Sequence, residues 1–340
     1  MKYPKIDHLI LFGGSRLLAE FALYLNKQMK YSMHIYSCER QLKEQIFPDG
    51  RTLGSVLKTN KIEFRSVEDI NSDAHVNEFV TTGTLGIGMG EAWQFSKELI
   101  KKFDGRLVDF MGIRLPQYRG GAHYSWQILR KTRLGCANLQ VVNEETVQGV
   151  FDSGEIVKSK EYFFPPSVRT PDDYFEAAVK EEAAFLIEFL EEIGSGKEFE
   201  LMKLQEQFSI YFPRLNTREH GFINWAWDTD EIEEFICAFD DPYLGASTFI
   251  NGKRVFVKKC TVEKNDGPFH PFQSGLIYKI YNNAIFVATR NGAIIVKEIF
   301  DEQGRSCLAS LKTGQRLFTP QKYLEAAMEY NAEYTSQGIK

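Results

Sequence analysis

Strand-like and helix-like stretches alternate through the first half of the chain. Asp7–Phe12 is a compact apolar run of the kind found in strands buried on both faces, and Leu17–Leu25 repeats its apolar residues at helical spacing. Strands that alternate with helices predict a parallel sheet covered on both faces. Further strands are predicted over Met33–Tyr36, Lys61–Phe64, Phe79–Ile87, Arg106–Phe110 and Ala137–Val142, with a helix over Glu91–Phe103.

A long helix is marked at both of its ends. Thr170 can cap the first turn, Pro171 fits the first helical position, and Asp172 and Asp173 place carboxylates at the positive end of the helix. The pattern predicts a helix that stops at Gly194–Gly196.

Short alternating runs characterise the last third of the chain. Asp228–Phe239 predicts an amphipathic helix with an acidic start, and Asn251–Gly252 and Asn291–Gly292 are turns of the hairpin type. Several short strands in one small domain suggest an open β-barrel. The predicted strands are Ala246–Ile250, Arg254–Lys259, Leu276–Tyr281, Ala284–Thr289 and Ala293–Ile299, followed by a helix capped at Thr319-Pro320.

These patterns divide the 340 residues into an α/β domain and a smaller β domain, each large enough for its own core. We expect the α/β domain over residues 1–196 and a connector over 197–218. The β-barrel domain is expected over 219–320, and a terminal helix or tail over 321–340.

Composition narrows the class of protein. The chain is 43% hydrophobic and 26% charged, and none of its apolar segments approaches the ~20 residues of a membrane span. The N-terminus lacks the long apolar core and cleavage site of a signal peptide. Five scattered cysteines without a Cys-x-x-Cys pair indicate a reducing cytoplasm. No His, Asp and Glu cluster has metal-ligand spacing, and a net charge of −5 argues against a nucleic-acid partner.

Two motifs stand out from this background. In Arg106–Gly121 (RLVDFMGIRLPQYRGG) a short apolar strand runs into a Leu-Pro-Gln-Tyr-Arg-Gly-Gly turn. About thirty residues later, Phe151–Ile156 (FDSGEI) forms a second tight turn built on Asp-x-Gly. Together and at this spacing, the two motifs resemble the folate-dependent formyltransferases, a family whose members act on methionyl-tRNA and on amino sugars.

The resemblance covers nearly the whole chain and implies a fold and a reaction. The fold is a Rossmann-like parallel sheet followed by an open, OB-like β-barrel, and the formyl donor is 10-formyltetrahydrofolate. The acceptor is an amine of a small molecule. Because acids and bases are nearly balanced over His220–Pro320, a nucleotide-linked amino sugar is favoured over methionyl-tRNA. A homodimer is left open.

The chain departs from the family at the catalytic residues. The family's Asn-x-His falls on Asp109 and Met111, whereas its Asp-x-Gly is present at Asp152. Formyl transfer needs a hydrogen-bond donor at the formyl oxygen and a base for the attacking amine. An ionised carboxylate only accepts hydrogen bonds, so Asp109 can donate only if strong desolvation or a nearby like charge, such as that of Asp152, keeps it protonated. His123 is a candidate for the missing imidazole, although a polar loop residue is the simpler interpretation.

Glycine-rich strand ends supply the remaining candidate residues. A turn after the first strand can present N–H groups to a substrate anion, and two arginines in the Leu-Pro loop suit a phosphate or carboxylate. The resemblance implies a pterin pocket beside a second glycine-rich loop. The predicted cofactor-binding residues are Gly86, Gly88, Met89, Gly90, Asn143 and Asp152, and the predicted substrate-binding residues are Gly13, Gly14, Ser15, Arg114, Tyr118, Arg119 and Gly120.

Three hypotheses follow for the function. The first is an N-formyltransferase that uses Asp109, Asp152 and His123 as its catalytic residues. The second is an inactive member of the family that binds folate or a nucleotide sugar. The third is a different acyl transfer or hydrolysis in the same pocket.

Overall fold

The computed structural model describes residues 1–47, 49–144, 154–332, 334–335 and 338–339. The chain forms two compact units that interleave along the sequence. Unit 1 contains Met1–Arg119, Leu134–Phe163 and Ala178–Tyr211, and unit 2 contains Gly120–Arg133, Phe164–Ala177 and Phe212–Lys340.

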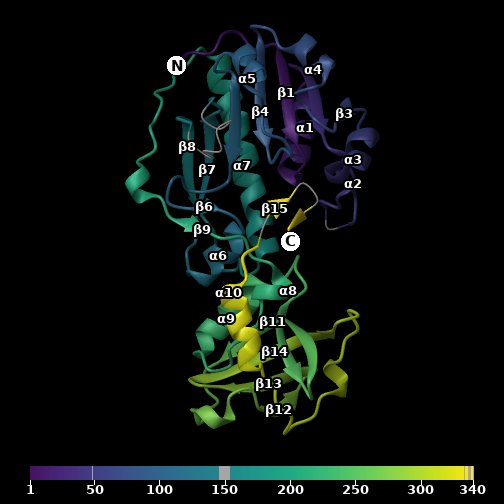
Figure 1. Cartoon of the computed structure of the whole chain (residues 1–340), viewed down its shortest axis with the longest axis vertical. Coiled ribbons are helices and arrows are strands. Elements are labelled where there is room, and N and C mark those ends of the chain that lie inside the picture. Colours follow the sequence, from purple (N-terminus) through teal and green to yellow (C-terminus); the bar gives the residue numbers. More distant parts are fainter. Residues whose placement is uncertain (48, 145–153, 333, 336–337, 340) are drawn as a thin grey trace. The chain divides into compact units, whose positions relative to one another are not determined.

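Unit 1 is built on a seven-stranded sheet with the order β3-β2-β1-β4-β5-β7-β8 (Figure 1). The strands from β3 to β5 are all parallel, which confirms the predicted sheet. At the other edge β7 runs antiparallel to both of its neighbours, β5 and β8. The sequence pattern did not predict this reversal. The strands are β1 (His8–Gly13), β2 (Ser32–Ser37), β3 (Phe64–Ser66), β4 (Thr84–Met89), β5 (Leu107–Met111), β7 (Leu134–Val141) and β8 (Ile156–Phe163).

Helices cover both faces of this sheet. Buried side chains of α4 and α5 pack with Phe12 and Leu107 on one face. Because successive residues of a strand point to opposite faces, Asp109 lies on the same face as Leu107. Phe110 points the other way and contacts Phe185 of α7, with ring centroids 6.4 Å apart. The helices are α1 (Arg16–Gln28), α2 (Glu39–Lys43), α3 (Leu53–Thr59), α4 (Ala74–Phe79), α5 (Lys97–Phe103) and α7 (Pro171–Gly194), and α7 confirms the predicted long helix.

The strand predicted from Phe79 begins only at Thr84. Phe79 is instead the last residue of α4, which the Asp73 carboxylate caps by accepting a hydrogen bond from Val76 N at 3.0 Å, and a short loop leads from this helix to the strand. The start of the predicted strand was therefore wrong.

The helix predicted over Glu91–Phe103 also starts late, at Lys97. Ser96 Oγ accepts a hydrogen bond from Leu99 N at 3.2 Å and fixes the first turn there. Glu91 consequently lies in the loop directly after β4, at the edge of the sheet, and not in a helix.

Unit 2 contains a five-stranded antiparallel sheet with the order β10-β11-β14-β13-β12 (Figure 1). This sheet agrees with the predicted small β domain. The turn at Asn251–Gly252 has both residues in the left-handed region, with φ of 49° and 75°, as its sequence predicts. The strands are β10 (Ala246–Ile250), β11 (Lys253–Glu263), β12 (Ile277–Tyr281), β13 (Ala284–Thr289) and β14 (Gly292–Asp301).

Four helices belong to unit 2 in the described chain, and short strand pairs complete the structure. The helices are α6 (His123–Leu129), α8 (Thr217–His220), α9 (Thr229–Ala238) and α10 (Gln321–Glu329), beside the first turns of α7. The short strands are β6 (Arg119–Gly120) with β9 (Tyr211–Phe212), and β15 (Tyr334–Thr335) with β16 (Gly338–Ile339).

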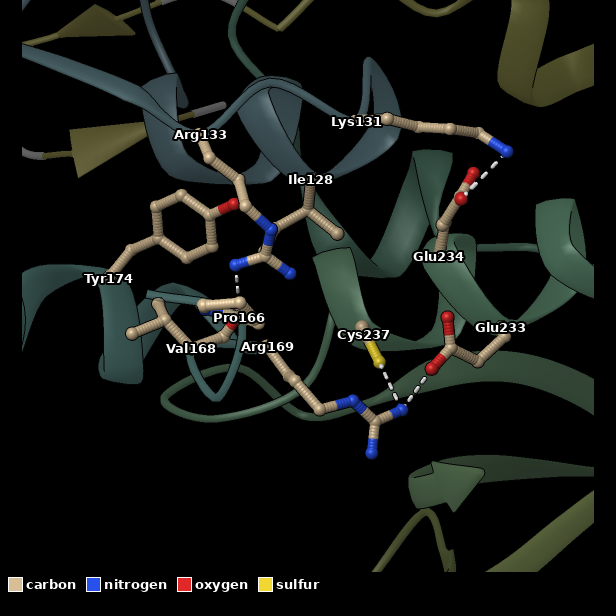
Figure 2. Close-up of a pocket in the computed structure, with 10 residues that line it drawn as sticks. All are labelled: Ile128, Lys131, Arg133, Pro166, Val168, Arg169, Tyr174, Glu233, Glu234 and Cys237. Carbon is tan, nitrogen blue, oxygen red and sulfur yellow. Dashed lines mark hydrogen bonds and ion pairs between the residues drawn. The ribbon is translucent and has the colours of Figure 1, made fainter. Parts of the chain in front are cut away.

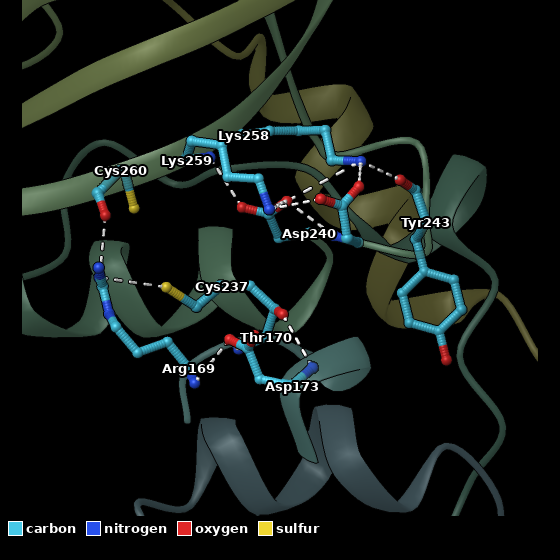
Figure 3. Close-up of polar contacts among 10 residues, drawn as sticks. Arg169, Thr170, Asp173, Cys237, Asp240, Tyr243, Lys258, Lys259 and Cys260 are labelled. Atoms are coloured by element: carbon cyan, nitrogen blue, oxygen red, sulfur yellow. Dashed lines mark hydrogen bonds and ion pairs between the residues drawn. The ribbon is translucent and has the colours of Figure 1, made fainter. Parts of the chain in front are cut away.

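A buried ion-pair network joins the end of α9 to β11 (Figure 3). Asp240 is 1% exposed, and its Oδ1 lies 3.8 Å from Lys258 Nζ and 3.5 Å from Lys259 Nζ. Its Oδ2 accepts a hydrogen bond from Lys259 N at 2.7 Å, and Lys258 Nζ donates to Tyr243 O at 2.7 Å. Both oxygens of a buried carboxylate are thus satisfied, which is the condition for such a charge to be tolerated.

Candidate functional site

The carboxyl ends of β1, β4 and β5 lie side by side in the sheet of unit 1. Their register places Phe12, Gly88, Asp109 and Gln140 in one row across β1, β4, β5 and β7. Ligands of open α/β sheets bind outside the carboxyl ends of the strands. This edge is therefore the candidate functional site.

The Gly13–Ser15 turn is packed tightly against its neighbours. Gly13 has φ of 125°, and a Cβ there would overlap Met89 O; a Cβ on Gly14 would overlap the side chain of Gln41. Ser15 Oγ caps α1 by accepting a hydrogen bond from its first turn at 3.2 Å. Close packing explains both glycines, and substrate binding by this turn stays a prediction.

The glycines of β4 differ in what surrounds them. A Cβ on Gly86 would lie 2.7 Å from Leu107 and 2.8 Å from Phe103, and Met89 is 2% exposed, so both residues pack inside the unit. Gly90, with φ of 73°, has no atom within 4 Å of the position of a Cβ, and its carbonyl accepts a hydrogen bond from Gln41 Nε2 at 2.7 Å. Gly90 is the predicted pocket residue beside which a flat ring has room to approach the backbone.

Two carboxylates lie beside Gly88. Asp109 Oδ1 and Glu91 Oε2 each lie 2.7 Å from the point where a Cβ of Gly88 would stand. The glycine is required because these carboxylates occupy the space of its missing side chain. Sequence reasoning missed Glu91, and the capping signal of Ser96 was the clue that it lies in the loop.

The other residues predicted for this edge, Met111, Asn143 and Asp152, add little to the description of the site. Met111 pairs with Asn138 of β7, whose side-chain amide donates to Ile113 O. Asn143 follows β7 and is half-buried. Asp152 lies outside the described residues, so its predicted roles stay predictions.

The Leu-Pro loop holds its arginines in ion pairs. Arg114 Nε lies 2.8 Å from Glu161 Oε1. Arg119 donates to both oxygens of Glu206, at 2.5 and 2.8 Å, and this bond lowers the pKa of the Glu206 carboxyl. Tyr118 N donates to Arg114 O at 2.9 Å. A substrate anion would therefore compete with protein carboxylates at both arginines.

Gly120 and His123 belong to unit 2, whereas Asp109 belongs to unit 1. Gly120 has φ of 110°, and a Cβ there would overlap Phe212 O, so the chain itself requires this glycine. His123 begins α6. Burial, together with the nearby Arg214 guanidinium, lowers the pKa of His123 to about 4, so its imidazole is neutral at pH 7.

A cavity of about 170 Å³ in unit 2 lies between α6, α9 and the start of α7 (Figure 2). The cations that line it are already engaged. Lys131 Nζ lies 2.8 Å from Glu234, Arg133 donates to two backbone carbonyls at 2.8 and 3.0 Å, and Arg169 pairs with Glu233. Because the cations that line this cavity already have partners, it is a weaker candidate for ligand binding than the sheet edge of unit 1.

In unit 1, a buried carboxyl lies on the face of the seven-stranded sheet that α7 covers. Glu182 is 3% exposed, and its Oε1 would lie 2.6 Å from a Cβ on Gly112. Tyr162 donates a hydrogen bond to Glu182 at 3.3 Å. Burial raises the pKa of Glu182 to about 7, and the Tyr162 bond opposes this shift only in part.

Replacing Glu182 with glutamine is expected to stabilise the protein increasingly as the pH rises. Between pH 4.5 and about 7 the folded chain keeps a proton that the unfolded chain has released, so this carboxyl weakens folding as pH increases. Glu182→Gln should gain on the order of 3 kcal/mol at pH 8 and little near pH 4, measured by urea unfolding. The exposed neighbour Glu181→Gln is the control, and a gain independent of pH would contradict the assignment.

Other classes of site find no support in the described residues. None of their His, Cys, Asp and Glu side chains gather in groups of three or more that could hold a metal ion. The five cysteines are free thiols. None of the described helices is both long and apolar enough to span a membrane.

Comparison with known proteins identifies the relatives of the chain. Residues 216–314 match the formyl transferase C-terminal domain family. A methionyl-tRNA formyltransferase from Desulfotalea psychrophila is 24% identical over 197 residues, which cover 57% of this chain and 57% of that protein. The chain thus spans little more than half the length of this curated relative.

Solved structures extend the similarity to both units. An N-formyltransferase from Helicobacter canadensis, in complex with folinic acid and dTDP-3-aminofucose, has a TM-score of 0.60 at 15% identity and covers 86% of this chain and 98% of its own. WlaRD, a sugar 3N-formyl transferase, has a TM-score of 0.61 at 17% identity and covers 86% and 97%. These similarities support the resemblance to the formyltransferases seen in the two motifs: residues 216–314 match a formyl transferase domain family, and the solved structures share the fold of this chain.

Proposed function

We propose that this chain transfers the formyl group of 10-formyltetrahydrofolate to an amine of a small molecule, with a nucleotide-linked amino sugar as the favoured acceptor. The observation that carries the proposal is the edge of β1, β4 and β5, where two carboxylates lie beside an open glycine backbone in a formyltransferase fold. The folinic acid and aminosugar nucleotide bound to the Helicobacter canadensis protein support both ligand classes.

The residues at this edge fit a folate. The pterin would lie beside Gly90, where no side chain fills the space, and Gln41 holds the loop in place through its bond to Gly90 O. When bound, the folate supplies the formyl group. A net charge of −5 favours a small acceptor over tRNA, which binds best to basic surfaces.

Turnover with a panel of acceptors tests this proposal. The purified chain should release tetrahydrofolate and formylate a nucleotide-linked amino sugar, detected by absorbance and mass spectrometry, with methionyl-tRNA as the competing acceptor. Donor binding without turnover on any amine would favour an inactive family member. Failure to bind the donor would exclude the folate part of the proposal.

A side chain at Gly90 is expected to block the donor. Gly90→Leu should weaken binding of 10-formyltetrahydrofolate at least ~tenfold in a calorimetric titration, because the leucine fills the open space. Gly252→Leu is a matched control. That hairpin glycine in unit 2 has φ of 75° and no neighbour within 4 Å, so both changes impose similar backbone strain. Equal losses in the two variants would contradict the placement of the pocket.

A further inference from the structure

A larger cavity in unit 2, of about 620 Å³, has no role in the proposed function. It is lined by the loop before α9, by the 3₁₀ turn η3 (Pro271–Gln273), by the turn between β13 and β14, and by the segment that leads into α10. Every residue that lines it belongs to unit 2. Its volume lies within the range of small-molecule sites, roughly 300–1,000 Å³, so the chemistry of its lining indicates what it could hold.

Two exposed phenylalanines line this cavity. Phe272 is 79% exposed and Phe318 is 58% exposed. Phe249 N donates to Phe318 O at 3.1 Å, and Phe318 N donates to Phe249 O at 2.9 Å. Arg316 Nη1 donates to Phe272 O at 2.6 Å and to Ser274 O at 2.9 Å. The backbone of both phenylalanines is thus held in place, and a flat ring can stack on their exposed side chains.

The cavity is also positively charged. Arg290 and Arg316 line it, and its lining contains no acidic residue. Arg316 uses Nη1 for the two carbonyls of the η3 segment, and its Nε and Nη2 groups have no hydrogen-bond partner in the described chain. Arg290 Nε lies 3.8 Å from Asp228 Oδ1, which already accepts a hydrogen bond from Asn291 at 2.9 Å. Both guanidinium groups therefore have donors left for an anion.

The aromatic and the cationic groups are adjacent. Arg316 Cζ lies 5.2 Å from the centroid of the Phe272 ring, so a ring that stacks on Phe272 can bring an attached anionic group to this guanidinium. An inorganic anion would leave the phenylalanines in water, and an uncharged ring would leave the guanidinium groups unused. A nucleoside phosphate has both a flat ring and an anionic group.

We infer that this cavity binds a free nucleoside phosphate. Its base stacks on Phe272 or Phe318, and its phosphate is bound by Arg290 and Arg316. The net charge of −5 favours a free nucleotide over a nucleic-acid strand. The inference does not depend on the proposed function, because the cavity belongs to unit 2, whereas the candidate site of formyl transfer belongs to unit 1.

Hydrogen exchange locates the bound nucleotide in the full chain. Thymidine monophosphate, added at about ten times its dissociation constant, should slow amide exchange up to ~tenfold in peptides that cover residues 272–274 and 316–324. Exchange in peptides of unit 1 reports separately on any nucleotide at the proposed acceptor site. The same concentration of inorganic phosphate should leave the rates in unit 2 almost unchanged, because phosphate cannot stack. Equal slowing by the two ligands would reject the stacked base and with it the inference.

Two substitutions at exposed positions separate the base from the phosphate. Phe272→Ala should weaken binding of thymidine monophosphate at least ~fivefold in a calorimetric titration, because a stacking surface is lost. Arg290→Ala should weaken nucleotide binding by a similar factor, but should leave the weaker binding of thymidine, which has no phosphate, unchanged. The matched controls are Phe163→Ala, an exposed ring in β8 of unit 1, and Arg305→Ala, an exposed arginine of unit 2, and both should bind as the unaltered chain does.

Three further results would overturn the inference. The first is slowed exchange that is confined to unit 1. The second is an unchanged dissociation constant in both Phe272→Ala and Arg290→Ala. The third is an occupant of another kind. A short thymidine oligonucleotide that binds ~100-fold more tightly than the monophosphate would assign the cavity to nucleic acid, and a dimer in sedimentation that Phe272→Ala dissociates would assign it to a second copy of the chain.

Discussion

Restoring the family's Asn-x-His pattern should raise the rate of the proposed formyl transfer. In the double variant Asp109→Asn and Met111→His, the amide at 109 would donate to the formyl oxygen and the imidazole at 111 would accept the amine proton. We expect kcat to rise at least ~tenfold above that of the unaltered chain, measured by release of tetrahydrofolate at pH 7.5. The strand supports this exchange, because residues 109 and 111 lie on the same face of β5.

The control for this gain is Met111→Gln together with Asp109→Asn. Glutamine fills a similar volume and can donate hydrogen bonds, but it cannot accept a proton from the amine, so turnover should stay below that of the histidine variant. The single variant Met111→His should gain less than the double variant, since a carboxyl still stands at position 109. Equal rates in the glutamine and histidine variants would contradict the role given to the imidazole.

Replacing Asp240 with alanine should destabilise unit 2 by removing a buried hydrogen-bond acceptor. The substitution leaves Lys258, which is 9% exposed, without one of its carboxylate partners, and leaves Lys259 N without its acceptor (Figure 3). Both lysines keep Asp241 as a partner, so the main cost comes from the backbone N–H groups of Asp241 and Lys259, which lose their acceptor, at ~1–3 kcal/mol each. Urea unfolding of the full chain, followed by tryptophan fluorescence, measures this cost.

Asp266 provides the comparison for this experiment. It also accepts from a lysine and a neighbouring group, Lys279 and Tyr278, each at 2.6 Å, but its contacts are solvated. Asp266→Ala should therefore leave the unfolding midpoint close to that of the wild type, as expected for an exposed ion pair. Similar midpoints for the Asp240 and Asp266 variants would contradict the role given to the buried network.

Local signals in the sequence predicted the elements that they mark directly. Ala246–Ile250 and Ala284–Thr289 have their predicted bounds because turn residues flank each run. The long helix α7 ends at Gly194 as predicted. The direction of β7 and β8 was not predictable in this way, because apolar spacing is the same in parallel and antiparallel strands.

The candidate site shows the same division between local and tertiary information. Glycine-rich strand ends predicted a site at the edge of the sheet where β1, β4 and β5 end. Glu91 was missed because apolar periodicity was extended backwards past the Ser96 cap. The partner of Arg119, Glu206, is 87 residues away along the chain, and only the folded structure brings them together. Sequence motifs thus predicted where a site would lie, whereas only tertiary contacts show which side chains are already paired there.

The interleaving of the two units limits how this protein can be divided. Unit 2 takes α6 and the first turns of α7 from segments that precede the family's C-terminal domain at residues 216–314. Ser125 of α6 donates to Ala238 O at 2.7 Å, and Arg169 contacts Glu233 and Cys260 O. A fragment cut at residue 216 would expose the surfaces that these segments cover. Gene fusion or domain exchange at residue 216 would therefore divide unit 2. We expect the segments before and after this residue to occur together in one chain.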